Sequence, residues 1–181
     1  MNDVEIYTIG HSNLSGEALV NLLRQHHIQV VVDVRSMPYS QYAPQFNREA
    51  LARTLSRAGI EYKYEGKRLG GRPEDPTCYK SGEVPASNKA DYLRLVDYDE
   101  VAQRDWYKAG ISDLLATAKG RRTAILCSEE DPNRCHRHHL IAQTLLDIGV
   151  TVWHIRGSGA LETPQGRQLR LMMFCRPCAS A

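Results

Sequence analysis

Residues 30–34 read Val-Val-Val-Asp-Val, and this nearly continuous run of β-branched residues constrains the fold more than any other part of the chain. Such a run is typical of a strand that is buried on both faces of a parallel sheet. Three further segments have a similar apolar character and predict more strands: Ile6–Ile9, Thr123–Leu126 and Val150–Ile155. A sheet of this kind requires helices on both of its faces.

Helical patterns separate these predicted strands. Ser15 can cap a helix that runs to the His26–His27 pair, and Asn47 can cap a second helix that Gly59 ends. The remaining predicted elements are a strand at 60–64, a long loop at 66–88, mostly helical residues at 91–119 with a break near 97–99, and a helix at 135–147.

The alternation of strands and helices predicts a single three-layer α/β domain, Rossmann-like, with a mainly parallel sheet and helices on both faces. A length of 181 residues fits one domain of ordinary size. We assign residues 1–157 to this domain and residues 158–181 to a C-terminal tail or extension, because the pattern weakens after Gly157.

The composition excludes some classes of protein and leaves others open. Hydrophobic residues make up 42% of the chain and charged residues 24%, which excludes a mainly disordered or fibrous protein. A net charge of +2 does not by itself argue for a nucleic-acid or membrane partner, and no run approaches the roughly 18 apolar residues of a membrane helix. We therefore expect a cytoplasmic protein whose five cysteines are thiols.

Polar residues gather where three predicted strands end. These segments are Gly10–Asn13, Asp33–Pro38 and Cys127–Arg137. Because the carboxyl ends of parallel strands share one edge of the sheet, we expect the three loops to face the same side, where ligands bind in open α/β sheets.

The residue types in these loops suit thiol chemistry on an anion. A cysteine at a strand end, opposite a helix start and near cations, can be held as a thiolate. We therefore predict Cys127 as nucleophile or redox thiol, Cys135 as resolving thiol and His11 as acid–base group. The predicted anion-binding side chains are Arg35, oriented by Asp33, and Arg137, oriented by Glu129.

Several alternatives stay open from the residues alone. Asp33 and Arg35 lie two apart on a strand and can form a purely structural ion pair, and Cys127 can be an ordinary buried residue. The Cys175–Cys178 pair, with Cys127 or Cys135 and His136, can supply four ligands to zinc, and iron is a further possibility. The cationic last third of the chain and the stretch 57–72 suggest nucleic-acid binding instead.

The loops carry an ordered series of short motifs: Tyr7–Ser12, Val32–Ser36 with Pro38, Gly59–Tyr62, Leu69–Arg72, Cys127–Glu129 with Pro132 and Cys135–Arg137, and His154–Ile155. In this series the chain resembles the domain of unknown function 488 family, a group of uncharacterised prokaryotic proteins. The resemblance implies an active site without naming its reaction.

We therefore hypothesise a thiol-dependent hydrolase or transferase that acts on a small anionic or nucleotide-like substrate and needs no cofactor. A nucleic-acid-binding or repair accessory module and a metal-binding structural or interaction protein are the alternatives. The predicted substrate-binding residues are Gly10, Ser12, Arg35, Ser36, Gly70, Gly71, His136 and Arg137.

Overall fold

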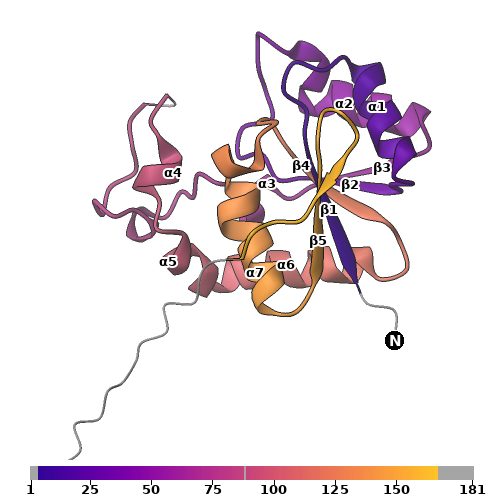
Figure 1. Ribbon diagram of the computed structural model, residues 1–181. Helices are drawn as coiled ribbons and strands as arrows, with labels where there is room; N and C mark the ends of the chain where they lie inside the picture. Colours follow the sequence, from indigo (N-terminus) through magenta and orange to yellow (C-terminus); the bar gives the residue numbers. More distant parts are fainter. Residues whose placement is uncertain (1–3, 88, 167–181) are drawn as a thin grey trace, which may run out of the picture.

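The computed structural model describes residues 4–87 and 89–166, which form a six-stranded sheet with the order β3-β2-β4-β1-β5-β6 (Figure 1). The first five strands are parallel, and β6 is antiparallel to β5. The strands are β1 (Glu5–Gly10), β2 (Val30–Asp33), β3 (Glu61–Tyr64), β4 (Thr123–Cys127), β5 (Thr151–Ile155) and β6 (Leu161–Glu162).

Helices cover both faces of the sheet and make three layers. The α-helices are α1 (Gly16–Gln25), α2 (Arg48–Arg57), α3 (Gly66–Leu69), α4 (Tyr92–Leu95), α5 (Tyr98–Gln103), α6 (Asp105–Ala118) and α7 (Gln143–Asp147). Apolar residues of α1 and α2 pack on one face of the sheet, while those of α6 and of residues 140–145 pack on the other. The predicted single α/β domain with a mainly parallel sheet is therefore confirmed.

The helix boundaries on the α1 and α2 side follow from local chemistry. The Ser15 hydroxyl accepts a hydrogen bond from the Ala18 backbone N–H at 3.0 Å and so caps α1 as predicted. Asn47 is the residue before α2, but its side chain accepts from the Ser40 N–H instead of capping the helix. Gly59 adopts a φ of +77° directly after α2, a conformation that glycine adopts without strain.

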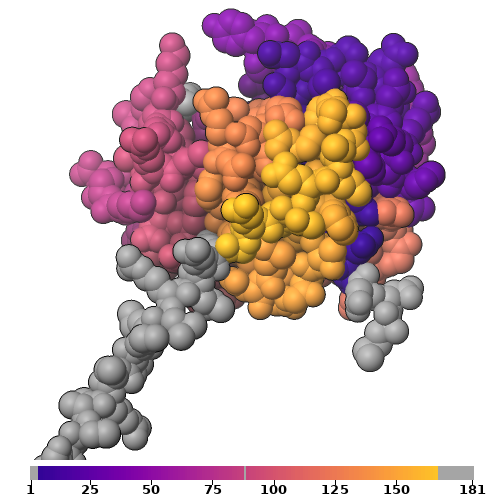
Figure 2. Space-filling view, viewed as in Figure 1, coloured from indigo at the N-terminus to yellow at the C-terminus, as the bar shows by residue number. Residues whose placement is uncertain are grey.

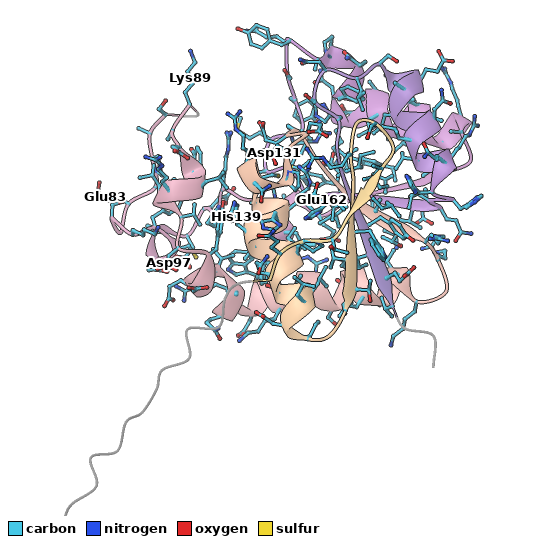
Figure 3. All side chains as sticks on the ribbon, viewed as in Figure 1. Glu83, Lys89, Asp97, Asp131, His139 and Glu162 are labelled. Carbon is cyan, nitrogen blue, oxygen red and sulfur yellow. The ribbon has the colours of Figure 1, made fainter. Side chains whose placement is uncertain are left out.

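The region between β3 and β4 is more ordered than the sequence indicates. The expected loop at 66–88 contains α3 and a 3₁₀ turn at Pro76–Cys78. The expected helical region at 91–119 is divided into α4, α5 and α6, and Asp97 caps α5 near the anticipated break. The segment with α4 and α5 projects beside the sheet in Figure 1 and forms the pink left side of the molecule in Figure 2, and Figure 3 shows Lys89 at its tip.

The last part of the domain differs from the prediction in two respects. The expected helix at 135–147 begins as a π-helix, Arg137–Ala142, and continues as α7. The sheet does not end at residue 157, because β6 pairs with β5 through Leu161 and Glu162. No helix in the described ranges has the length and apolar character needed to cross a membrane.

The strand order places a crevice at the carboxyl end of β4. This strand lies between β2 and β1. The chain leaves β1 and β2 toward the face that carries α1 and α2, whereas it leaves β4 toward the opposite face, where residues 140–145 pack. Loops that diverge at neighbouring strand ends leave room for a ligand between them.

Candidate functional site

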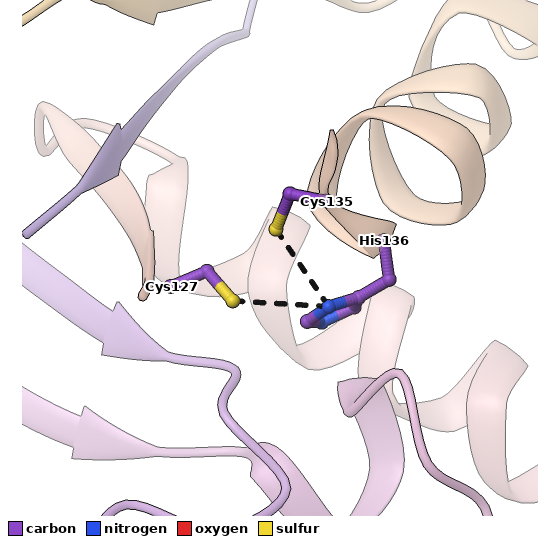
Figure 4. Close-up of side chains that lie close together, drawn as sticks. All are labelled: Cys127, Cys135 and His136. Atoms are coloured by element: carbon purple, nitrogen blue, oxygen red, sulfur yellow. Dashed lines mark hydrogen bonds between the residues drawn. The ribbon is translucent and has the colours of Figure 1, made fainter. Parts of the chain in front are cut away.

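Two thiols and an imidazole lie together at the carboxyl end of β4 (Figure 4). His136 Nδ1 is 3.8 Å from Cys127 Sγ and 3.8 Å from Cys135 Sγ. The three atoms lie within 4.8 Å of one another, and all three side chains are buried. We call Cys127, Cys135 and His136 the cysteine–histidine cluster.

Short local structures hold the cluster in place. Cys127 is the last residue of the fully buried strand β4. A 3₁₀ turn at Pro132–Arg134, capped by the Asp131 carboxylate, brings the chain back, and the Cys135 N–H donates to the Pro132 carbonyl at 3.0 Å. The three buried side chains of the cluster therefore lie between the end of β4 and the start of the π-helix.

The surroundings shift the pKa values of the two thiols in opposite directions. The hydrogen bond between the thiols and their burial raise the pKa of Cys127. Burial opposes ionisation of Cys135, but the hydrogen bond with Cys127, the adjacent His136 and the Arg137 guanidinium outweigh it and lower the pKa of Cys135. The backbone N–H of Arg137 also donates to Cys135 Sγ at 3.5 Å. These contacts favour Cys135 as the sulfur that carries the negative charge.

The cluster borders a cavity of about 780 Å³, which we call the site cavity. Its rim carries three cations, Arg72, Lys89 and Arg134, together with aromatic and apolar side chains. In the part of the chain that the structure describes, none of these three cations forms an ion pair with a carboxylate. The lining also includes Arg35, Ser36, Met37, Tyr39, Gly71, Tyr92, Leu93, Tyr98, Ser128, Glu129 and Asn133.

Arg35 lines the cavity, and hydrogen bonds to Asp33 fix the orientation of its guanidinium. Its Nε donates to Asp33 Oδ1 at 2.8 Å, and its Nη2 donates to Asp33 Oδ2 at 2.6 Å. Asp33 is fully buried and also accepts from the Tyr62 hydroxyl at 2.8 Å. The ion pair anticipated from the two-residue spacing is present, and it presents Arg35 to the cavity in one orientation.

His11 does not have the position expected of an acid–base group. Its ring stacks on Phe46 at a centroid distance of 4.2 Å, its Nε2 lies 3.2 Å from Arg35 Nη1, and it is not part of the cavity lining. Burial lowers the pKa of His11 to about 4, so the imidazole is neutral at pH 7. The contacts make His11 a support for Arg35 instead.

Arg137 is the clearest correction to the predicted substrate-binding set. It is fully buried, its Nη1 and Nη2 donate to the carbonyls of Glu129 and Glu130, and its Nε donates to Thr8 Oγ1. The guanidinium therefore fixes the loop after β4 and does not face the cavity. Glu129 holds Arg137 through its backbone carbonyl, not through its carboxylate as predicted, and its exposed side chain lines the cavity.

The predicted glycines permit close approaches of other groups. A Cβ on Gly10 would lie 1.7 Å from the Glu129 carbonyl oxygen, so only glycine lets β1 end against that loop. A Cβ on Gly71 would lie 2.6 Å from the Cγ of His136, so Gly71 determines where the imidazole sits. At Gly70 the Gly66 carbonyl and the Ser36 hydroxyl leave equally little room.

The structure thus divides the predicted site residues into two groups. Those that line the cavity are Arg35, Ser36, Gly71, Cys127, Glu129, Cys135 and His136. Those that lie behind the lining are Gly10, His11, Ser12, Asp33, Gly70 and Arg137. Ser12 belongs to the second group because its N–H donates to the Ser128 carbonyl at 2.8 Å.

Sequence reasoning missed the residues that the segment 89–98 contributes. Tyr98 lies close enough to both thiols for their charges to affect its ionisation, and burial raises the pKa of Tyr98. Lys89 and Tyr92 line the same cavity as Tyr98, and Arg72 stacks on the Tyr92 ring at 4.5 Å. The only local signal was the break at Asp97, which places Tyr98 at the start of α5.

Two of the five basic residues in the stretch 57–72 are paired with carboxylates. Arg68 pairs with Glu65 at 2.8 Å and with Asp113 at 2.7 Å. Lys63 lies 3.7 Å from Glu61. The ion pairs therefore account for part of the basic character of this stretch, and they supply no evidence for the nucleic-acid hypothesis.

The cluster is also the group whose ligand atoms could hold a metal ion. Among the described residues, Cys127, Cys135 and His136 are the three-residue set with ligand atoms close enough together. The His136 Nε2 is buried and has no hydrogen-bond partner in the described ranges. The Cys175–Cys178 pair, predicted as further ligands, lies outside the described residues.

A family model described as "Domain of unknown function DUF488" matches residues 15–144. The chain belongs to this family. The matched range includes the cluster and Arg35, so the cavity of this DUF488 protein is lined mainly by the region that defines the family. No curated protein and no solved structure among those compared matches the chain.

Proposed function

We propose that this DUF488 protein is a thiol-dependent hydrolase or transferase that acts on an organic anion in the site cavity. The observation that carries the proposal is the position of the cysteine–histidine cluster. Two thiols and an imidazole border a cavity that is also lined by the cations Arg72, Lys89 and Arg134. Among the residues that the structure describes, the Nε2 of this imidazole has no hydrogen-bond partner and these three cations have no carboxylate partner. Nucleophile, proton carrier and anion-binding groups are the parts that such a reaction needs.

Cys135 is the better nucleophile of the two thiols. Its sulfur accepts a hydrogen bond from the Arg137 backbone N–H and lies at the start of the helix that continues into α7. Both features stabilise negative charge on sulfur. Cys127 then acts as hydrogen-bond donor to the thiolate, whereas the sequence indicated Cys127 as nucleophile or redox thiol and Cys135 as resolving thiol.

His136 moves protons in the proposed reaction through both of its ring nitrogens. Nδ1 faces the sulfurs and accepts the thiol proton, and Nε2 then donates a proton to the leaving group. The Cys135 sulfur forms a bond to an electrophilic carbon or phosphorus atom of the substrate while the bond to the leaving group breaks. Water or a second acceptor then takes the transferred group and frees the sulfur.

The cavity indicates the size and charge of the substrate. About 780 Å³ lies in the range of roughly 300–1,000 Å³ typical of sites for organic ligands and exceeds what a bare inorganic anion needs. Arg72, Lys89 and Arg134 attract negative charge, while Tyr92 and Tyr98 offer aromatic surface. A nucleotide-like anion fits these features.

Alkylation at one fixed pH tests the assignment. Reduced, metal-free protein is treated with iodoacetamide at pH 7, and each thiol is quantified by peptide mapping. We expect Cys135 to react about tenfold faster than free cysteine, because a stabilised thiolate replaces a thiol that is only a few per cent ionised. A rate no higher than that of free cysteine would refute the nucleophile assignment.

Protection by an anion tests the substrate class in the same assay. Adenosine monophosphate is expected to slow the alkylation of Cys135, and Arg72→Ala is expected to weaken that protection. Arg57→Ala is the matched control, because Arg57 is an exposed arginine outside the cavity lining. Equal protection in all three proteins would refute the role of Arg72, and no protection of the wild type would exclude binding of this anion in the cavity.

A further inference from the structure

We propose that the cysteine–histidine cluster binds Zn²⁺, with Cys127 Sγ, Cys135 Sγ and His136 Nδ1 as ligands and the fourth position open to the site cavity. The observation behind the proposal is that His136 Nδ1 is equidistant, at 3.8 Å, from the two sulfurs. A single strong hydrogen bond would bring the imidazole closer to one of them. Equal spacing to both sulfurs is the arrangement that a shared central ion would give.

The distances match a tetrahedral ion closely. With Zn–S near 2.3 Å and Zn–N near 2.0–2.1 Å, a tetrahedral angle separates sulfur from nitrogen by about 3.6 Å and sulfur from sulfur by about 3.8 Å. The sulfur–nitrogen distances are 3.8 Å, and all three atoms lie within 4.8 Å of one another. An ion can therefore bind after side-chain shifts and without movement of the backbone.

The donor set selects the class of metal. Two thiolates and one imidazole suit zinc and other borderline or soft cations, whereas magnesium and calcium prefer oxygen ligands. Two thiolates balance the charge of a divalent ion. Each protonated thiol releases its proton to the solvent when the ion binds, and no electrons are transferred.

An independent observation supports His136 as a ligand. His136 is about nine-tenths buried and lines the cavity, yet its Nε2 has no partner among the described residues. A metal-bound histidine normally donates its other N–H to an acceptor. Nε2 lies on the side of the ring away from Nδ1, so it can donate to one acceptor in the cavity while a separate water or anion occupies the open position on the ion.

Metal binding and thiol catalysis exclude each other at this site. An ion held by both sulfurs occupies the electron pairs that attack on a substrate requires, so Zn²⁺ is an inhibitor of the reaction. This consequence rests on the proposed function, whereas metal binding itself does not. The two claims can therefore be tested separately on one protein preparation.

Binding is measured on the full-length, reduced protein after removal of metal. Zn²⁺ is titrated in competition with a chromophoric chelator, and Co²⁺ is used as a spectroscopic substitute. We expect one equivalent of high-affinity metal that depends on the cluster, and Co²⁺ spectra with thiolate charge transfer and tetrahedral d–d bands. Absence of stoichiometric binding, or an octahedral Co²⁺ spectrum, would overturn the site.

Variants assign the ligands. Cys127→Ser and Cys135→Ser are each expected to weaken the affinity of this site by more than the roughly 10–100-fold that loss of an outer-shell partner causes. Cys78→Ala, at a buried thiol outside the cluster, and the double variant Cys175→Ser/Cys178→Ser are the controls and should retain it. Loss of the high-affinity site only in the double variant would refute the assignment. Circular dichroism confirms that each variant is folded.

The alkylation assay then distinguishes the two claims. Zn²⁺ is expected to suppress modification of Cys135 in step with site occupancy. If the metal-free thiol is unreactive while Zn²⁺ still binds, the proposed function fails and the metal site stands. If Zn²⁺ binds and the alkylation rate is unchanged, mutual exclusion is refuted.

Discussion

The buried imidazole of His154 makes the stability of the protein depend on pH in a way that can be calculated. His154 is fully buried, its Nδ1 lies 2.7 Å from Thr8 Oγ1, and its Nε2 lies 3.1 Å from His138 Nδ1. Burial lowers the pKa of His154 from 6.5 to about 3, and the charges of Arg137, His138 and Arg156 act in the same direction. Cys135 opposes them weakly.

The sign of the effect follows from proton binding. The unfolded chain protonates His154 below pH 6.5, whereas the folded protein keeps it neutral down to about pH 3. The unfolded state therefore gains protons first, and stability is lost as the pH falls from 6.5 toward 3. At pH 4.5, two units below 6.5, the loss from this group is about 3 kcal/mol at 1.36 kcal/mol per unit.

The variant His154→Asn isolates this contribution. Free energies of unfolding are measured by urea denaturation at several values between pH 7.5 and pH 4.5 for the wild type, for His154→Asn and for His27→Asn. His27 is an exposed histidine with a φ of +55°, a conformation that asparagine tolerates, so its variant is the matched control.

We expect the stability difference between wild type and His154→Asn to shrink by about 3 kcal/mol from pH 7.5 to pH 4.5. The control should lose stability in parallel with the wild type. His11, whose pKa burial lowers to about 4, adds a similar slope to all three proteins and cancels in the comparison. If His154→Asn also falls in parallel with the wild type, the buried neutral imidazole does not control acid stability and the reasoning is refuted.

Three further substitutions test the groups behind the cavity lining. Asp33→Asn removes the charge that pairs with buried Arg35, and urea denaturation is expected to show a loss of about 3–5 kcal/mol; an unchanged midpoint would contradict this. Gly10→Ala is expected to lower the thermal midpoint by several degrees because its Cβ meets backbone atoms, whereas Gly157→Ala, which meets only a flexible side chain at 3.7 Å, should leave it unchanged. Gly71→Ala is expected to displace the imidazole of the cluster and to weaken Zn²⁺ binding while the protein stays folded; unchanged affinity would show that Gly71 does not position that ring.

The fold was predictable because its signals are local. The valine run at 30–34 and the apolar segment at 123–126 each lie on a strand that is buried on both faces. The strand order was not predictable, because nothing in these segments indicates that β4 inserts between β1 and β2. That insertion depends on packing between distant parts of the chain.

The composition of the cavity was only partly predictable, for a related reason. Parallel strands bring their loops to one edge, and Arg35 and Ser36 from the loop after β2 line the same cavity as Cys127, Cys135 and His136 from the segment after β4. Tyr98 and Lys89 also line the cavity, but they belong to a segment between β3 and β4 that contains no strand of the sheet. Their contribution depends on how α5 packs against the π-helix, which the sequence does not encode locally.

Arg35 and Arg137 show why residue type alone does not identify a substrate-binding group. Arg35 follows the end of β2 and Arg137 begins the π-helix after β4, and both are nearly or fully buried. Arg35 is paired with a carboxylate and remains in the cavity wall, while Arg137 donates to two backbone carbonyls and is removed from it. A buried guanidinium takes whichever acceptors the fold supplies, since an unpaired buried charge is costly. Some residues of a motif can therefore support the cavity from behind while others line it. We expect substitutions of the supporting residues to reduce stability, and substitutions of the lining residues to reduce ligand binding in a protein that stays folded.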